Sequence, residues 1–466
     1  MSGLESSGSF EPETRALHGS WAAVARLTLQ VIGVAVLVSL VVSALREAVH
    51  LAAAALVSLG QGADWRAGVT LAAAMAAIGF GRGLLLRRPD WRFTSLDAIA
   101  LTRERQRAPP ASLQDSLAVV VKKSLATLLT LGGGGSGGLE APVVLVGQAG
   151  AAAWGRQTRA TTPAIALFEV CGVAAAISTL LGAPLTGALF AVELLYGERV
   201  AYRSLAWALT ASVVAYWLST AIHGVHPLFV APPHGAAYSL PEYGGAALVG
   251  IAVALPLAWA FRGTTRWLSG VMARVQPTWH AVVTMALLGG LTVALQATLG
   301  LEAFHVLGSG EETLRLVLRD DVSLAAWWLP LVLVAARLAA VGLTLSGGGS
   351  AGTLFPSMTL GGLSGAFVAK LVTASGLAVL DPSLFAVVGI AAALTGVVGV
   401  PIAAMTLVLE VFGKAYGPPA ILACGITYIV SLRLRLWQQE DSTWDAGARA
   451  LKWISRLARR DPERPA

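Results

Sequence analysis

The sequence predicts an all-helical protein that crosses a membrane several times and is built from two related halves. Three observations support this fold class. Only 13% of the 466 residues are charged, about half the share found in a soluble domain, and the mean hydropathy is +0.70. Apolar stretches long enough to span a bilayer recur along the chain. Two segments of the first half return, in the same order, in the second half.

The apolar stretches predict the membrane helices in order. A hydrocarbon core about 30 Å thick needs about 20 apolar residues in a helix. Stretches of suitable length lie at 27–58, 66–86, 114–131, 161–181, 203–222, 240–261, 278–300, 323–345 and 357–380. Shorter stretches, which predict tilted or partial helices, lie at 183–196, 384–397, 400–412 and 417–436.

Basic residues gather in two places that predict the topology. Six arginines lie between positions 87 and 107, and a second basic cluster lies between 433 and 460. Because basic residues beside membrane helices mark the cytoplasmic side, we expect both regions there. The N-terminal segment 1–25 and the short basic tail 446–466 are also expected in the cytoplasm. No nucleic-acid partner is expected, since the clusters flank predicted spans and accompany no recognisable nucleic-acid-binding module.

The chain contains two copies of one arrangement. Residues 133–142 (GGGSGGLEAP) match residues 347–356 (GGGSAGTLFP) at a separation of 214 positions. Residues 172–195 match residues 389–412 at a separation of 217 positions. Internal repeats with glycine-broken helices are typical of transporter folds, in which the substrate site lies where the broken helices meet.

The repeat divides the membrane region into half one, residues 26–225, and half two, residues 226–445, which we expect in inverted orientation. Residues that match between the halves are expected to form buried, structural parts of the scaffold, because a charge inside a span is costly unless it has partners. The matched charged residues are Lys123 with Arg337 and Glu193 with Glu410. Residues that differ are freer to serve function, and Glu140 has Leu354 as its counterpart.

Each half places a glycine-rich break just before a helix start. Glycine allows tight turns and leaves backbone amides uncovered, and Pro142 and Pro356 stand where a first helical turn favours proline. A helix N-terminus offers unpaired N–H groups and the positive end of a dipole, which together bind anions. Two such starts that converge from the two halves predict a site for a small anion.

Glu140 stands at the first of these breaks, and its carboxylate is itself an anion. When ionised it is expected to occupy the place that a permeating anion needs, and when protonated or displaced it is expected to open the path. Alternatively, this carboxylate caps its own helix or lies exposed in a loop.

These residues resemble the CLC family of chloride channels and proton/chloride antiporters, over roughly residues 30–445. SGGLEAP (136–142) is similar to the family motif Gly-Arg/Lys-Glu-Gly-Pro, with Glu140 at the gating glutamate, and GTLFP (352–356) is similar to Gly-x-Phe-x-Pro. Residues 181–193 and 398–410 resemble the paired helices that build the family's dimer interface.

The resemblance implies an inverted helical repeat that forms a homodimer in the bilayer, with one anion path per subunit. It implies chloride as the transported ion, no cofactor and no metal, and a bacterial inner membrane as the location. It places five backbone amides at the anion: those of Leu139, Glu140, Ala141, Thr353 and Leu354.

Several positions depart from the family pattern. For the serine of the first anion motif the candidates are Thr94 and Ser95, which are equally suited to cap a helix. Trp444 takes the place of the family's tyrosine near the C-terminus and can donate a hydrogen bond through its indole N–H; alternatively, it is a tryptophan at the membrane interface. An inner glutamate, found in many antiporters directly after the position of Glu193, is Leu194 here.

Three functions remain open on the sequence. An anion path with weak or no proton coupling is favoured by Leu194, which cannot carry a proton. A proton/chloride antiporter is the alternative. An intramembrane serine enzyme is a remote third, because GGSGG around Ser136 matches a nucleophile pattern, but Ser350 occupies the equivalent place in half two. We expect a transport protein and not an enzyme.

Overall fold

The computed structural model describes residues 21–59, 65–86, 112–196, 202–224, 228–232, 234–235, 238–321, 324 and 326–433. Three residues singled out from the sequence, Thr94, Ser95 and Trp444, lie outside the described residues, and so does the C-terminal tail. Within the described ranges the chain is helical and forms no β-strand beyond isolated bridges.

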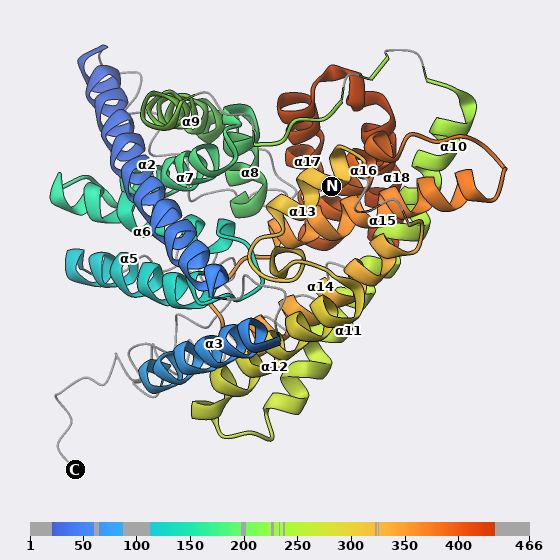
Figure 1. Cartoon of the computed structure of the whole chain (residues 1–466). Coiled ribbons are helices and arrows are strands. Elements are labelled where there is room, and N and C mark those ends of the chain that lie inside the picture. Colours follow the sequence, from blue (N-terminus) through green and yellow to red (C-terminus); the bar gives the residue numbers. More distant parts are fainter. Residues whose placement is uncertain are drawn as a thin grey trace.

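Figure 1 shows helices α5 to α9 on one side of the molecule and helices α13 to α18 on the other. The first half contains α2 (Trp21–Ser58), α3 (Trp65–Leu86), α5 (Leu113–Thr127) with the π-helical turn η2 (Leu128–Gly132), α6 (Glu140–Gln157), α7 (Thr162–Leu181), α8 (Pro184–Tyr196) and α9 (Tyr202–His223). The second half contains α10 (Leu240–Leu248), η3 (Val249–Val253), α11 (Ala254–Met272), α12 (Pro277–Leu299), η4 (Ala303–His305), α13 (Glu311–Leu318), α14 (Leu329–Ser346), α15 (Leu354–Ala374), α16 (Pro382–Ala393) with η6 (Leu394–Val398), α17 (Pro401–Leu407) with η7 (Val408–Phe412), η8 (Lys414–Tyr416) and α18 (Gly417–Arg433).

The multi-pass membrane prediction is confirmed. Within the described residues, eight helical segments are long and apolar enough to cross a membrane. The apolar pattern did not predict α6 or α13. α6 is rich in glycine and alanine, and Arg156 and Gln157 end it, so its hydropathy is low although nearly all of it is buried inside the protein. α13 is a short amphipathic helix that begins with two glutamates.

The two halves are inverted, and their glycine loops meet across an approximate two-fold axis. Gly138 and Gly352 are repeat equivalents, and each donates its N–H to the carbonyl of the other, at 2.9 and 2.6 Å. This reciprocal antiparallel pairing is what a two-fold axis between the loops produces. A second exchange follows the same symmetry, because Ser136 N–H donates to Thr344 Oγ1 at 2.9 Å and Ser350 N–H donates to Thr130 Oγ1 at 3.1 Å.

The matched glutamates make a reciprocal pair of helix caps. Glu410 accepts hydrogen bonds from the N–H groups of Leu185 and Thr186, at 2.9 and 2.8 Å, at the start of α8. Glu193 accepts from the equivalent amides at the start of α17, at 3.1 and 2.9 Å. Each carboxylate thus sits at the positive end of a helix from the other half, which is favourable. The expected burial is wrong for Glu410, which is exposed, and Glu193 is only half-buried.

Candidate anion site

The break between α5 and α6 is a turn that glycine makes possible. Gly134 has φ +88°, and its repeat equivalent Gly348 has φ +73°, a region that side chains disfavour. The next residue in each loop then folds back, since Gly135 N–H donates to Thr130 O at 2.8 Å and Gly349 N–H donates to the equivalent carbonyl at 2.9 Å. These turns deliver the starts of α6 and α15 to the same place between the halves.

Glu140 begins α6, and its carboxylate lies at the start of α15 from the other half. The residue is 2% exposed. Its Oε1 accepts hydrogen bonds from the backbone N–H groups of Leu354 and Phe355, the latter at 3.2 Å. The carboxylate therefore does not lie in an exposed loop, and it reaches across to the start of the opposing helix. It occupies the N-terminus of the opposing helix, which is where a bound anion is stabilised.

The amides at this site differ in one respect from those expected. Leu354 donates to Glu140 as expected, but the second donor is Phe355, which sequence reasoning missed. Its amide lies one residue further into the first turn, where a helix still has free N–H groups. Thr353 and Leu139 occupy the N-cap positions of α15 and α6, and neither side chain makes a capping hydrogen bond.

A small cavity adjoins the carboxylate. Its volume is about 10 Å³, about enough for one water molecule. Its lining residues are Glu140, Ala141, Val144, Phe190, Thr353, Leu354 and Val398. The side chains of Phe190 on α8 and Val398 in η6 carry no polar group, so the polar character of this cavity comes from the carboxylate and the helix starts.

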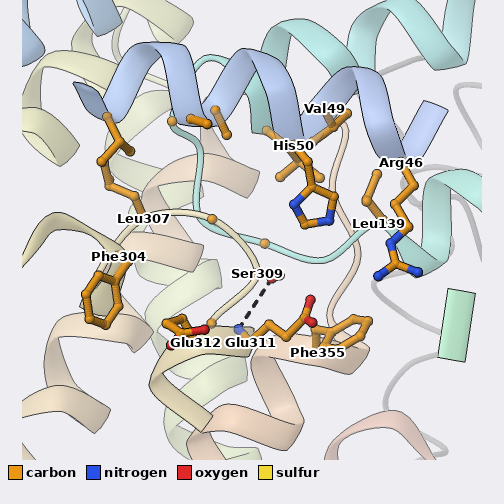
Figure 2. Close-up of a pocket in the computed structure, with 18 of the residues that line it drawn as sticks. Arg46, Val49, His50, Leu139, Phe304, Leu307, Ser309, Glu311, Glu312 and Phe355 are labelled. Atoms are coloured by element: carbon orange, nitrogen blue, oxygen red, sulfur yellow. Dashed lines mark hydrogen bonds between the residues drawn. The ribbon is translucent and has the colours of Figure 1, made fainter. Parts of the chain in front are cut away.

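A much larger cavity, of about 600 Å³, reaches the site from one side. Figure 2 shows it between α2, the first glycine loop and α13, with Arg46 and His50 above and Phe355 below. Leu139 lines this cavity rather than the small one. Two acidic residues at its rim are paired within α13, since Arg315 contacts Glu311 at 2.5 Å and Glu312 at 3.0 Å.

Arg337 holds the first glycine loop in place. Its side chain is fully buried and donates to Gly308 O and Phe304 O, both at 2.9 Å, and to Ser136 Oγ and Leu307 O, both at 3.3 Å. Its partners are carbonyl and hydroxyl oxygens of the loops, not carboxylates. Because guanidinium has no acceptor and keeps its charge, it cannot act as a base for Ser136. This contact disfavours the serine-enzyme hypothesis.

Arg82 plays a similar part for the second glycine loop, and sequence reasoning missed it. It is 3% exposed and donates to Gly347 O at 2.5 Å and to Thr130 Oγ1 at 3.3 Å. An arginine well inside the apolar stretch 66–86 was the available signal, since such a charge usually marks function or a buried partner. Lys123 is also buried, one turn before Thr127, whose hydroxyl contacts Ser350 Oγ at 2.8 Å.

The comparisons with known proteins agree with this geometry. The family model described as voltage gated chloride channel matches residues 97–432. The chain belongs to the voltage-gated chloride channel (CLC) family. A curated CLC relative, the "Chloride/fluoride channel protein" of Pseudomonas syringae pv. tomato (strain ATCC BAA-871 / DC3000), is 25% identical over 268 residues, which cover 56% of this chain. The chain spans about half the length of that relative, 55%.

Three solved CLC structures share the fold. A CLC-type fluoride/proton antiporter has a TM-score of 0.71 and 20% identity, with 88% of this chain and 96% of the other covered. A slow cyanobacterial Cl−/H+ antiporter has a TM-score of 0.75 and 18% identity, with 90% and 98% covered. A eukaryotic CLC transporter has a TM-score of 0.69 and 16% identity, with 89% and 73% covered.

Proposed function

We propose that this protein carries chloride or a similar small anion across a membrane, through a path that Glu140 opens and closes. The observation that carries the proposal is the buried Glu140 carboxylate bound to the amides of Leu354 and Phe355. A negative group of the protein fills a helix-start site that suits a negative ion of similar size. Membership of the CLC family supports the same conclusion.

The mechanism follows from competition for these amides. While Glu140 is ionised, its carboxylate satisfies the N–H donors of α15 and blocks the path. An anion from the large cavity must displace it, or a proton must neutralise it, before the amides become available. Because backbone dipoles rather than a full positive charge hold the anion, binding is weak enough for release.

Glu140→Gln tests this function. Chloride efflux from proteoliposomes is measured at pH 4.5 and 7.5 for both proteins. Glutamine keeps the size of the side chain but carries no charge, so we expect flux that no longer responds to pH. A mutant that retains the pH response of the unmodified protein would show that Glu140 is not the gate.

We propose that proton coupling is weak. Leu194 is 2% exposed on α8 and cannot titrate, although many family members have a glutamate there. Tight proton/anion antiport is the second candidate, favoured by the two solved relatives that are named antiporters. The anion is chloride or fluoride, since the relatives' names include both.

We also propose a homodimer in a bacterial inner membrane. α8 and α17 pack against each other, and together with η7 they present outward the apolar side chains of Leu185, Ile402 and Leu409, which are 44, 40 and 43% exposed. In the family the corresponding helices join the subunits. A bacterial relative supports the location. We likewise propose that half one of the membrane region ends at residue 225 and that half two begins at residue 226.

A further inference from the structure

A second carboxylate, Glu169, is buried inside the membrane region and has no part in the site described above. It lies in the middle of α7, a span whose residues are mostly buried in the protein, and is itself 1% exposed. Its Oε2 accepts a hydrogen bond from Gln148 Nε2 on α6 at 3.2 Å. An ionisable group at such a depth is costly and usually serves transport.

The repeat shows that the fold does not need this polar pair. The equivalents of Gln148 and Glu169 in half two are Gly362 and Ala386, at the same separations of 214 and 217 positions. There a Cβ on Gly362 would lie 3.8 Å from Ala386 O, so α15 and α16 cross closely with no polar side chain at these positions. The same crossing in half one is therefore possible without a carboxylate.

The position of Glu169 relative to the gate is set by α6. Gln148 lies eight residues after Glu140, a rise of about 12 Å along the helix. α6 packs beside α5, and Arg156 at its end donates to Ser116 Oγ near the start of α5 at 3.1 Å. α6 thus returns to the side where α5 begins, directly after the arginine-rich region expected in the cytoplasm.

The large cavity lies toward the other end of α7. Leu180 lines it, and the eleven residues from Glu169 to Leu180 correspond to about 16 Å of helix. Glu169 is thus on the cytoplasmic side of Glu140, and the cavity meets the gate from the opposite side.

We propose that Glu169 is a second proton-binding site, which passes protons between the cytoplasmic side and Glu140. The inference rests on the proposed gating role of Glu140. The Glu169 carboxylate takes a proton from cytoplasmic water and becomes neutral. The proton then passes through water to the Glu140 carboxylate, which becomes neutral while Glu169 regains its charge. Only O–H bonds form and break.

Val143, Val144 and Leu145 of α6 are at most 1% exposed and carry no polar group. Transfer between the two carboxylates is therefore slow, which fits weak coupling.

The other described ionisable groups on the helices around α7 are bound to other residues, exposed, or part of the lining of the large cavity. Arg156 is bound to Ser116 and to Ala152 O, Glu193 caps α17, and His223 on α9 lies 3.8 Å from Glu47 of α2. The remaining described charges of α2 are Arg26, which is exposed, and Arg46 with His50, which line the large cavity.

Two substitutions separate a proton role from a packing role. Glu169→Gln keeps the shape and the hydrogen-bonding capacity but cannot titrate, whereas Glu169→Asp titrates but fits less well. The experiment records chloride and pH together from proteoliposomes with a chloride gradient, after size-exclusion chromatography has shown each variant folded. Glu302→Gln, which removes an exposed carboxylate, is the matched control.

We expect Glu169→Gln to lower proton flux about tenfold or more, as loss of a proton-transfer group does, with chloride flux nearly unchanged. Glu169→Asp should retain part of the proton flux, and Glu302→Gln all of it. Undiminished proton flux in a folded Glu169→Gln protein, or no proton flux in the unmodified protein beside robust chloride flux, would overturn the inference. Absence of chloride flux from the unmodified protein would instead refute the proposed function.

Discussion

Removing the Arg337 side chain should destabilise the protein more than any surface arginine does. Two carbonyl oxygens that accept from it at 2.9 Å, those of Phe304 and Gly308, would lose their donor inside the protein. Each unsatisfied buried acceptor costs about 1–3 kcal/mol, and the removal of a fully buried arginine also leaves a cavity. We therefore expect Arg337→Ala to lower the free energy of unfolding by about 2–6 kcal/mol.

The assay is the midpoint of thermal unfolding, followed by the loss of the folded peak in fluorescence-detected size-exclusion chromatography. Arg315→Ala is the matched control, because its ion pairs with Glu311 and Glu312 lie within one helix and are partly exposed, and such pairs are worth about 0.3–0.5 kcal/mol each. Arg337→Ala should unfold at a clearly lower temperature than Arg315→Ala. A folded Arg337→Ala protein of unchanged midpoint but altered anion selectivity would refute the scaffold role and place the guanidinium at the anion.

The same contacts lead to three further predictions. In the unmodified protein, chloride flux should rise as pH falls, because protonation removes the charge with which Glu140 competes for the amides; flux that falls toward pH 4.5 would contradict this. Glu193→Ala and Glu410→Ala should destabilise the protein by similar amounts, about 0.5–2 kcal/mol as for other helix caps, in the same unfolding assay. Leu194→Glu should increase the protons moved per chloride, recorded with a pH electrode, and a ratio no higher than that of the unmodified protein would show that Leu194 is not what limits proton coupling.

The repeat made much of this site predictable from the sequence. Matched glycines, prolines and charges predicted two broken helices whose starts converge, and the difference between Glu140 and Leu354 singled out one carboxylate. The pairing of Gly138 with Gly352 is the structural counterpart of that match. Matching the two halves does not show in which direction the Glu140 side chain points from its helix. It therefore could not predict which amides the carboxylate reaches.

Other features escaped prediction for separate physical reasons. The start of α6 was predicted, but hydropathy did not mark its extent, because a helix buried inside the protein needs small residues for close packing rather than high hydropathy. Glu410 was expected to be buried because it matches Glu193 in the repeat, yet the contact it makes at the start of α8 needs only exposed backbone amides. Phe355 was missed as a donor because the backbone N–H group is the same in every residue except proline. The residue type therefore does not show which amide the Glu140 carboxylate reaches.

The two halves share a scaffold but differ in their ionisable residues. A binding site shared equally by two inverted halves would look the same from both sides of the membrane and would have no means of control. The reciprocal pairs, Gly138 with Gly352 and Glu193 with Glu410, hold the two halves together and leave such a symmetric site between them. Glu140 and Glu169 both belong to half one, and their equivalents Leu354 and Ala386 have no ionisable side chain. If Glu140 and Glu169 act as proposed, protons reach the shared site from one half only, and control of an otherwise symmetric path depends on these two carboxylates.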